Sequence, residues 1–353
     1  MTVLKLGSLF DGIGVFPLAA VHCGMEPVWA SEIEARPISI TKRHFPDMLH
    51  LGDITKISGA EIPPVDVITF GSPCQDLSQI GTRNGFAGKK SSLFYQAMRI
   101  IEEMRYATNG RYPAFTVWEN VAGAFSSNDR LDFAAMLSAF TGAEVSVPPR
   151  GWAHAGMVRG GRADTAWRLL DAQYWGEPAL AQRRKRVFVV ADFAGQRAGE
   201  VLFKPRTVLP FSTISGPGGL SATQRGGVPA AQTGRQVPIV RPFSLRRMRT
   251  MAQVGDQKGF CASFGRGGEP FPTLLASVTA PFSFWYEGEE QDGFLRVLTP
   301  LECERLMGLP ENWTKYGCKN EEISDHARYR ALGNSIALPC AEYVMAGIAE
   351  VMN

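Results

Sequence analysis

A cysteine at the end of an apolar segment is the residue of this chain best suited to covalent chemistry. Residues 66–70 predict a buried strand of β-branched and aromatic side chains, and a sharp turn then presents Cys74 at its tip, Gly71-Ser72-Pro73-Cys74-Gln75. Only a thiolate is a good nucleophile, and backbone N–H groups or cations near a strand's carboxyl end favour that form. A buried apolar cysteine is the other interpretation, and Cys74 alone does not decide between them.

A carboxyl group and a basic run also lie at the ends of predicted strands. Glu119 follows the strand predicted over Ala114–Trp118, where a carboxylate is either a solvated cap or, if it faces the thiol, a proton-sharing group. The run Gln182-Arg183-Arg184-Lys185-Arg186 abuts the strand predicted over Val187–Ala191. Basic runs are often only solvated faces, but beside a strand alternate side chains are held rigidly and can point into a cleft.

A glycine-rich turn lies near the start of the chain. Val3–Phe10 predicts a buried strand, Asp11-Gly12-Ile13-Gly14 a turn, and Val15–Cys23 an apolar helix. This order lets a backbone approach a nucleotide-like ligand at a helix N-terminus. Glu32 ends the next predicted strand, Pro27–Ala30, where a carboxylate can bind ribose hydroxyls. The glycine spacing alone is equally compatible with a purely structural turn.

Composition narrows the class of protein. Hydrophobic residues make up 45% and charged residues 20% of the 353 positions, as in folded globular proteins, and the net charge of +3 indicates no particular partner. The six cysteines form no CxxC pair and no His/Cys cluster of metal-ligand spacing, which predicts free thiols in a reducing compartment and no zinc site. Without a signal-peptide layout or a bilayer-length apolar run, we expect an intracellular, soluble protein.

The middle of the chain departs from this regular pattern. Asp76–Ser91 is a polar, glycine-punctuated loop of a length typical of functional lids, and a helix is predicted over Ser92–Glu103. The segment Asn128–Ala172 is longer than a simple helix–strand connection and suggests no role. From about 193 to 294, linker-like stretches, clustered arginines and a β-rich aromatic segment predict a smaller, irregular, mainly β domain.

The regular pattern resumes near the carboxyl end. Arg296-Val297-Leu298-Thr299-Pro300 leads into a predicted helix that starts at Pro300, with Thr299 as its N-cap. A final helix is predicted after Leu332-Gly333-Asn334-Ser335-Ile336. The chain contains no internal repeat.

In this order the motifs resemble the DNA (cytosine-5)-methyltransferases, particularly the compact bacterial and phage enzymes. The resemblance covers nearly the whole chain except about 193–294, and the number and order of the motifs make it highly specific. The motifs that carry it are Leu9-Phe10-Asp11-Gly12-Ile13-Gly14, Glu32, Gly52-Asp53-Ile54, Gly71-Ser72-Pro73-Cys74-Gln75, Glu119-Asn120-Val121, Gln182-Arg183-Arg184-Lys185-Arg186, Arg296-Val297-Leu298-Thr299-Pro300 and Gly333-Asn334-Ser335.

The resemblance implies an α/β fold with two domains. Residues 1–192 and 295–353 would form a Rossmann-like, S-adenosylmethionine-dependent methyltransferase domain with a mixed, mostly parallel sheet. Residues 193–294 would form the smaller, irregular, mainly β target-recognition domain. The final helix would return to the cofactor site.

The resemblance also implies a mechanism. A thiolate adds to C6 of a flipped-out cytosine, which makes C5 nucleophilic enough to take a methyl group. Cys74 is then the nucleophile, and Glu119 binds N3 and the exocyclic amine. Arg184 binds O2 of the base, with Arg186 in support. No motif identifies the base that removes the C5 proton.

S-adenosylmethionine is the implied cofactor, with Glu32 on its ribose hydroxyls and Asp53 on the adenine amino group. The expected cofactor-binding residues are Phe10, Gly12, Gly14, Glu32, Ile33, Asp53, Ile54, Asn334 and Ser335. The expected DNA contacts are Gln75, Ser78, Arg83, Lys89, Arg241, Arg246, Arg247 and Arg249.

Double-stranded DNA is the implied partner, and the resemblance implies neither a metal nor a membrane. It further implies a monomer in the bacterial cytoplasm, associated with the nucleoid. A companion restriction endonuclease and a phage or prophage origin are compatible with it, and the recognition sequence stays open. The catalytic turn departs from the family, because Ser72 precedes the proline where many relatives have an aromatic residue.

Three other functions are less compatible with the sequence. The tRNA-methylating branch of the same family tends to lack a sizeable recognition domain, whereas this chain has a long variable segment. A catalytically silent binding protein would have little reason to keep Cys74, Glu119 and Arg184 together. Amino-methyltransferases acting on adenine or on cytosine N4 use an Asp/Asn-Pro-Pro-aromatic turn, and Pro73-Cys74-Gln75 stands in that place here.

Overall fold

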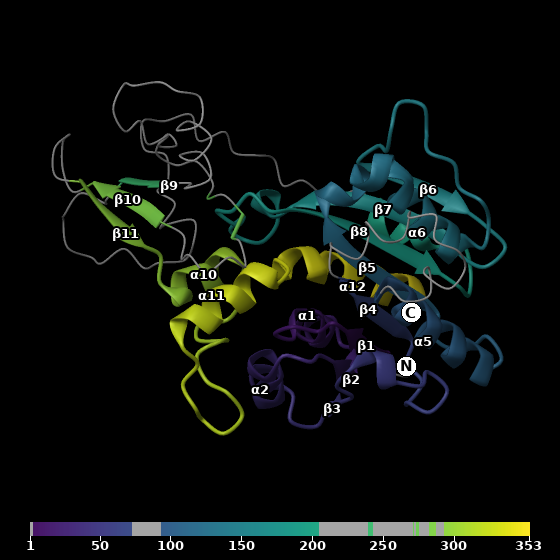
Figure 1. Ribbon diagram of the computed structural model, residues 1–353, viewed down its shortest axis with the longest axis horizontal. Coiled ribbons are helices and arrows are strands. Elements are labelled where there is room, and N and C mark those ends of the chain that lie inside the picture. Colours follow the sequence, from purple (N-terminus) through teal and green to yellow (C-terminus); the bar gives the residue numbers. More distant parts are fainter. Residues whose placement is uncertain are drawn as a thin grey trace.

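The computed structural model describes residues 3–72, 93–204, 239–242, 271, 273–274, 282–286 and 293–353. Eight strands of this part form one sheet in the order β3-β2-β1-β4-β5-β8-β7-β6, and three others form a second sheet (Figure 1). The strands of the large sheet are β1 (Lys5–Leu9), β2 (Glu26–Ser31), β3 (Leu49–His50), β4 (Val67–Phe70), β5 (Phe115–Val121), β6 (Ala155–Arg159), β7 (Asp164–Asp171) and β8 (Lys185–Asp192).

The large sheet is mixed. Strands β3, β2, β1, β4 and β5 pair in parallel, whereas β8, β7 and β6 add to the β5 edge by antiparallel pairing. The chain leaves β1 toward β2 on one side and returns through β4 on the other, so the carboxyl ends of β1 and β4 flank a topological switch point. Ligands of open α/β sheets bind at such a point. The expected α/β fold is confirmed.

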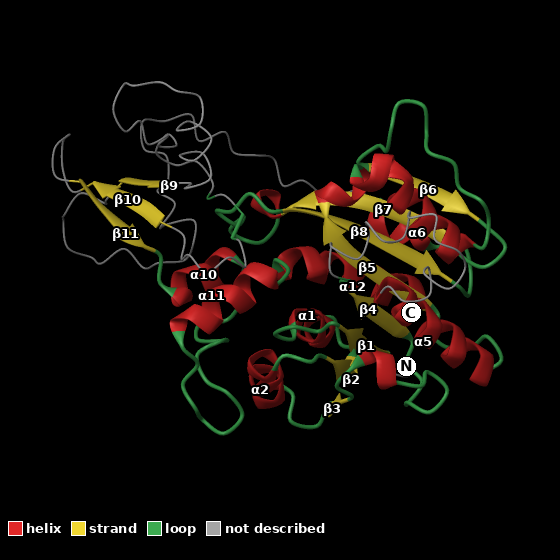
Figure 2. Ribbon diagram, in the orientation of Figure 1, coloured by secondary structure: helices red, strands yellow, loops and turns green. Residues whose placement is uncertain are grey.

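Helices cover both faces of this sheet (Figure 2). One buried core contains residues of α1, α7 and α12, and the other contains residues of α5 and α6. Apolar burial on both faces explains why β4 is buried along its whole length. The helices are α1 (Val15–His22), α2 (Ala35–His44), α5 (Leu93–Ala107), α6 (Leu131–Thr141), α7 (Ala198–Leu202), α10 (Pro300–Leu306), α11 (Asp325–Asn334) and α12 (Leu338–Met352).

The second sheet is small and antiparallel. It contains β9 (Ile239–Pro242), β10 (Phe282–Tyr286) and β11 (Gly293–Val297), in the order β11-β10-β9. Residues 193–204 lie with the large sheet, because α7 packs on β7 and α12, and Arg168 donates a hydrogen bond to the Leu202 carbonyl at 2.8 Å. We therefore propose that the smaller domain begins after Lys204 rather than at 193.

The segment Asn128–Ala172 forms α6 and the β6–β7 hairpin, which extends the large sheet at its edge. Trp152 anchors the connection between them, since its indole N–H donates to the Arg130 carbonyl at 3.0 Å and its ring contacts Phe133 and Trp167 edge-on. The segment thus has a structural role that its sequence did not indicate.

The predicted start of α10 is confirmed. Thr299 and Glu302 form a capping box, in which each side chain bonds to the other residue's backbone N–H, and Pro300 stands in the first turn. The final helix, α12, begins at Leu338 as expected, whereas α11 was not predicted. No single helix of the described residues is long and apolar enough to cross a membrane, although α11 and α12 together, bent by 43°, meet that test.

Candidate active site

The end of β4 is held against β5. Ser72 is buried, its hydroxyl accepts a hydrogen bond from the Trp118 indole at 3.1 Å, and its carbonyl accepts one from the Asn120 amide at 3.0 Å. A Cβ on Gly71 would lie 3.1 Å from an oxygen of Glu119, so this position favours glycine. The chain therefore leaves β4 toward Pro73 and Cys74 from a point packed directly against Glu119.

Glu119 and Arg186 form an ion pair at this corner. The Arg186 Nε lies 3.0 Å from the Glu119 Oε1, and the two side chains are 14% and 12% exposed. Val121 is the cross-strand partner of Arg186, so Glu119 is its diagonal neighbour on the same face of the sheet. Burial raises the pKa of the Glu119 carboxyl, and the charges of Arg186 and Arg184 partly oppose that effect. A carboxyl group in this setting keeps its proton to a higher pH than an exposed glutamate does.

Arg184 lies in a different setting from the one that the resemblance implies. Its side chain is fully buried, and its guanidinium donates to the carbonyls of Leu274 at 2.9 Å, of Gly333 at 2.8 Å and of Ser335. Burial lowers the pKa of Arg184 to about 9, which leaves the group charged at neutral pH. Because both of its Nη nitrogens donate to main-chain oxygens, Arg184 holds segments together, while its buried Nε has no hydrogen-bond partner among the described residues. Arg186 is the arginine that pairs with Glu119.

The basic run alternates as its position beside a strand predicted. Arg183 and Lys185 are exposed, whereas Gln182, Arg184 and Arg186 point inward. The strand starts earlier than expected, since β8 begins at Lys185. Two of the five side chains therefore belong to the sheet itself.

The glycine turn after β1 has an unusual backbone. Phe10, Gly12 and Gly14 all have positive φ, at 55°, 60° and 78°. Such a conformation is strained for phenylalanine, and strain of this kind concentrates at functional sites. A Cβ on Gly12 would meet no described atom within 4 Å, so open space lies in front of the turn. Helix α1 begins directly behind it at Val15.

Glu32 stands at the carboxyl end of β2 and faces this turn. Its carboxylate accepts backbone N–H bonds from Gly12 at 2.9 Å, Ile33 at 2.7 Å and Glu34 at 2.9 Å. A carboxylate can accept about four hydrogen bonds, so capacity remains for a ribose hydroxyl. The neighbouring Ile33 side chain is 73% exposed, which leaves an apolar surface beside the carboxylate.

Asp53 and Ile54 follow the short strand β3 and have different settings. The Asp53 carboxylate caps a 3₁₀ turn by accepting from the Thr55 N–H and hydroxyl at 2.9 and 2.8 Å, and these bonds lower its pKa. The group is open to solvent and to a ligand. Ile54 is only 3% exposed and belongs to the core below the turn, so its side chain contributes packing rather than the expected cofactor contact.

The carboxyl end of α11 brings Asn334 and Ser335 to the large domain. Asn334 is exposed, and the carbonyl of Ser335 accepts from Arg184. The loop before α11 reaches the glycine turn directly, because the Trp313 indole N–H donates to the Ile13 carbonyl at 2.8 Å. Trp313 also stacks on His44, with ring centroids 3.6 Å apart. Sequence reasoning gave Trp313 no role, and no motif marks it.

Asp11 is a second residue to which sequence reasoning gave no role. Both carboxyl oxygens are buried and have no hydrogen-bond partner among the described residues. Burial, with a smaller contribution from the nearby Glu32 charge, raises the Asp11 pKa to about 7, against the opposing effect of the Ser8 and Thr41 hydroxyls. The glycine turn therefore contains a carboxyl group that is largely protonated below neutral pH.

Several expected site residues lie outside the described residues. Arg241 lies on β9, where only the backbone is described. Those beyond the described ranges are Cys74, Gln75, Ser78, Arg83, Lys89, Arg246, Arg247 and Arg249. Among the residues that the structure describes, no cluster of three or more His, Cys, Asp or Glu side chains could hold a metal ion.

The described residues at the carboxyl ends of β1, β2 and β3 fit S-adenosylmethionine. The open space at Gly12 can admit a ligand next to the backbone, the remaining acceptor capacity of Glu32 suits ribose hydroxyls, and the exposed Ile33 suits an adenine face. Asp53 lies at the next strand end, within the same rim of the parallel sheet. These residues stay the proposed cofactor contacts, whereas the Ile54 side chain packs in the core.

Comparisons with known proteins identify the family of this chain. A protein of Escherichia phage P1, named DNA N-6-adenine-methyltransferase, is 24% identical over 98% of this chain, and the chain spans 61% of that protein's length. The type II methyltransferase M1.ScrFI of Lactococcus lactis is 27% identical over 99% of this chain and 78% of its own length. The Schizosaccharomyces pombe Dnmt2 structure shares the fold, with a TM-score of 0.60, 14% identity and full coverage of both chains. The model of the C-5 cytosine-specific DNA methylases matches residues 4–205 and 243–350, and the chain therefore belongs to that family.

Proposed function

We propose that this chain transfers a methyl group from S-adenosylmethionine to C5 of a cytosine flipped out of double-stranded DNA, through a covalent bond between Cys74 and C6. The observation that carries this proposal is the buried Glu119–Arg186 pair, packed against the strand end that leads to Pro73 and Cys74. A carboxyl group of raised pKa beside a fixed guanidinium is suited to bind the N3 and O2 edge of a cytosine ring.

The residues divide the chemistry as follows. The Cys74 sulfur forms a bond to C6, and the ring electrons move toward N3, where the Glu119 carboxyl supplies a proton or a strong hydrogen bond. Arg186 donates to O2, and Arg184 keeps the surrounding backbone in place. When bound, S-adenosylmethionine supplies an electrophilic methyl group for C5. A base then removes the C5 proton, and the bond to Cys74 breaks to release the thiolate.

The residues at the carboxyl ends of β1, β2 and β3 bind the methyl donor in this proposal. Gly12 lets the backbone approach the ligand, Glu32 accepts from ribose hydroxyls, and Ile33 lies against adenine. Asp53 accepts from the adenine amino group, and Asn334 closes the methionine end from the carboxyl side of α11.

The name of the phage P1 relative raises adenine N6 as a second target. An amino group needs a lone pair directed at the methyl donor and no covalent adduct, whereas carbon C5 needs a nucleophile at C6. The turn Pro73-Cys74-Gln75 supplies a thiol and lacks the Asp/Asn-Pro-Pro-aromatic pattern of amino-methyltransferases. Cytosine C5 is therefore the favoured target.

The partners and location of the protein are proposed on the same basis. The chain would act as a monomer on double-stranded DNA in the bacterial cytoplasm, at the nucleoid. The phage and type II relatives favour a phage or prophage origin or a companion restriction endonuclease. The RNA-methylating alternative is disfavoured because the described part of the variable segment forms a sheet of its own, β9–β11, as we expect of a recognition domain.

The test is expression of the full chain in a host without endogenous cytosine-5 methylation. Bisulfite sequencing of host DNA locates the methylated site, and mass spectrometry of digested nucleosides distinguishes 5-methylcytosine from N6-methyladenine. We expect 5-methylcytosine at one sequence, and none with Cys74→Ala. N6-methyladenine alone, or equal methylation by the Cys74→Ala variant, would contradict the proposal.

The covalent step has its own test. A duplex with 5-fluorocytosine at the located site, mixed with S-adenosylmethionine, should become linked to the wild-type chain because fluorine cannot leave as a cation when the adduct should break down. Peptide mass spectrometry should find the modified peptide at Cys74. If the enzyme methylates DNA but forms no such adduct, the assignment of Cys74 as the nucleophile is wrong.

A further inference from the structure

The glycine turn that follows β1 contains a buried carboxyl group to which the proposed mechanism gives no task. Both oxygens of Asp11 are buried, and neither has a hydrogen-bond partner among the described residues. Burying a carboxyl group without a partner costs free energy, so packing alone does not explain why the turn keeps it. Unsatisfied and strained groups of this kind concentrate where proteins bind ligands.

The polar neighbours of Asp11 do not satisfy it. The Thr41 hydroxyl donates to the carbonyls of Gly12 at 3.1 Å and Pro37 at 3.0 Å, so its proton is committed elsewhere. The Ser8 hydroxyl is buried and, like Asp11, has no partner within the described part of the chain. Both hydroxyls lie close enough to lower the Asp11 pKa, but the effect of burial outweighs them.

The charge that acts on Asp11 is that of Glu32, which follows β2 and bonds the same turn. It has the same sign, so it makes ionisation of Asp11 less favourable. Three backbone N–H groups donate to the Glu32 carboxylate and stabilise its charge. Asp11 has no such donors in the described structure, so a cation at this turn would stabilise Asp11 most.

The basic residues in the last turn of α2 act on other groups. Lys42 acts on His50 and helps burial to lower the pKa of that ring. Arg43 bonds the loop before α11. Burial lowers the pKa of His44, so this ring is mostly uncharged at neutral pH. No cation of the described residues is therefore among the charges that act on Asp11.

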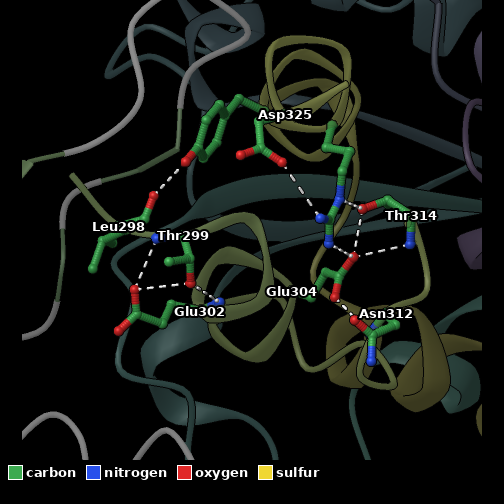
Figure 3. Close-up of polar contacts among 9 residues, drawn as sticks. Leu298, Thr299, Glu302, Glu304, Asn312, Thr314 and Asp325 are labelled. Carbon is green, nitrogen blue, oxygen red and sulfur yellow. Dashed lines mark hydrogen bonds and ion pairs between the residues drawn. The ribbon is translucent and has the colours of Figure 1, made fainter. Parts of the chain in front are cut away.

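The glycine turn is held in place from the other end of the chain. The Trp313 indole N–H donates to the Ile13 carbonyl of the turn at 2.8 Å. Trp313 is itself fixed by the fully buried Glu304, whose carboxylate accepts backbone N–H bonds from Asn312 at 2.8 Å and Thr314 at 2.9 Å (Figure 3). This support opposes a movement of the turn that would expose its buried carboxyl group to water.

The ligand proposed for this turn changes its charge during the reaction. S-adenosylmethionine carries a positively charged sulfonium one methylene away from its ribose, whereas the product, S-adenosylhomocysteine, has a neutral thioether there. The Gly12 N–H donates to the proposed ribose ligand Glu32 at 2.9 Å, so Asp11 is next in sequence to a residue at the ribose site. A buried carboxylate attracts a cation over a longer distance than a hydrated one, because little solvent screens it.

We propose that Asp11 makes the glycine turn bind the cationic donor in preference to the neutral product. This inference rests on the proposed binding of S-adenosylmethionine at the turn. The carboxyl proton passes to solvent when the sulfonium binds, and the carboxylate and the sulfonium stabilise each other. When methyl transfer leaves a thioether, this attraction ends, Asp11 takes up a proton again and the product dissociates more readily. Asp11 thus determines specificity without taking part in the chemical step.

The preference for the donor should depend on pH. Burial raises the Asp11 pKa to about 7, so the carboxyl group is neutral at about pH 5.5 and ionised at about pH 8.5. A sulfonium that lowers this pKa by about one unit binds the ionised form about 10-fold more tightly. The dissociation constant of the product, divided by that of the donor, should therefore rise by about 5- to 10-fold between these pH values.

Calorimetry of the full chain with each ligand, without DNA, measures both dissociation constants at the two pH values. Asp11→Asn keeps the shape of the side chain but cannot ionise, so it should lack this rise in the ratio. Both ligands carry an amino group of their own, and the comparison with the variant removes its contribution. Buffers of different ionisation enthalpy should show about half a proton more released by the wild type than by the variant when the donor binds at about pH 6.5.

Asp47→Asn is the matched control, because it removes the same charge from an exposed position between α2 and β3. It should keep the wild-type ratio at both pH values. Melting temperatures of all variants show whether each is folded under the conditions of the titrations. If Asp11→Asn does not fold, Asp11→Ser provides the same comparison with a smaller side chain that also cannot carry the charge.

The outcomes separate the two proposals. A chain that binds neither ligand refutes the donor site of the proposed function, and the inference fails with it. Equal pH dependence of the ratio in the wild type and in Asp11→Asn refutes the inference alone. A chain that shows the Asp11-dependent preference but makes no 5-methylcytosine supports the inference and refutes the proposed methylation of DNA.

Discussion

At the scale of single residues, the site depends on which charged groups lie near one another. Glu119 is buried against Arg186, whereas Arg184 is committed to three main-chain carbonyls. Both Nη nitrogens of Arg184 already donate to backbone carbonyls, so a base bound at either of them would compete with those bonds, whereas the buried Nε has no hydrogen-bond partner among the described residues. The two arginines of the basic run therefore have different tasks, and Arg186 is the candidate for contact with the cytosine.

Glu119→Gln should slow adduct formation by ~100-fold or more, because an amide cannot supply the proton that the carboxyl holds. Burial raises the Glu119 pKa, so the wild-type rate should fall as the pH rises through that pKa, and the variant should lack this dependence. Stopped reactions with the 5-fluorocytosine duplex measure the rate. Glu102→Gln, on the exposed face of α5, should behave like the wild type. A Glu119→Gln rate within a few-fold of wild type would reject the role at N3.

Asp11→Asn should change how stability depends on pH. The folded chain keeps the Asp11 proton up to about pH 7, against an ordinary pKa of 3.8, so unfolding releases a proton between these values and rising pH destabilises the fold. The variant avoids this cost. The difference in free energy of unfolding between the variant and the wild type should therefore be roughly 3 kcal/mol larger at pH 8 than at pH 5.

Denaturant unfolding at the two pH values measures this difference. The exposed Asp47→Asn is the matched control and should follow the wild type at both. An equal offset for Asp11→Asn at pH 5 and pH 8 would show that the Asp11 carboxyl does not titrate in this window.

At the scale of elements, the glycine turn is supported from the other end of the chain. The loop between α10 and α11 places the Trp313 indole on the Ile13 carbonyl and its ring on His44. Positive φ at Phe10, Gly12 and Gly14 leaves this turn with few backbone bonds of its own. The Trp313 N–H therefore helps to keep this turn in the conformation that we propose to bind the methyl donor.

Trp313→Phe keeps an aromatic ring against His44 but removes the N–H that bonds Ile13. We expect the dissociation constant for S-adenosylhomocysteine to rise by about 2- to 10-fold, the usual net value of one hydrogen bond. Trp167, on β7, donates a comparable bond to the Ala153 carbonyl at 3.0 Å. Trp167→Phe loses this bond and should leave the dissociation constant for S-adenosylhomocysteine unchanged. Equal effects of the two variants, measured by calorimetry, would argue against a specific role for Trp313.

At the scale of the whole molecule, the large sheet and the small sheet carry different parts of the proposed function. At the carboxyl ends of its parallel strands, the large sheet brings Glu119 together with the residues that we propose to bind the methyl donor, which follow β1, β2 and β3. The small sheet leads directly into α10 after β11 (Figure 1), and residues 271 and 273–274, before β10, bond to Arg183 and Arg184 of the large domain. With a net charge of only +3, the affinity for DNA must come from local clusters of basic residues rather than from the overall field.

The arginines of the variable segment are the expected cluster. Each phosphate contact adds about 0.9 to the slope of log affinity against log salt, so Arg246→Ala with Arg247→Ala should lower its magnitude by about 1.8. Fluorescence anisotropy of a labelled duplex between about 50 and 200 mM salt gives the slope. Arg111→Ala, an exposed arginine on the large domain, is the control and should keep it. An unchanged slope in the double variant would remove these residues from the DNA interface.

The amino-acid sequence by itself was enough to predict the α/β fold, the glycine turn, the strand that leads to Cys74 and the capping of α10 by Thr299. The α/β fold follows from the family that the motifs resemble, and each of the other features depends on a local pattern: a short apolar run, glycine placement, or a capping residue beside proline. The order of motifs was also sufficient to identify the family. The helix α11 escaped prediction because its ten residues are mostly polar and charged and show little apolar periodicity.

Only the tertiary structure decided the division of work within the basic run and the places of Asp11, Ile54 and Trp313. The sequence shows five adjacent residues at 182–186 but not which carbonyls or carboxylates surround each of them. Those neighbours come from residues 274, 333 and 335, up to about 150 positions away, and from Glu119 on the adjacent strand. Burial and partner choice arise when distant segments pack, so local patterns carry no record of them.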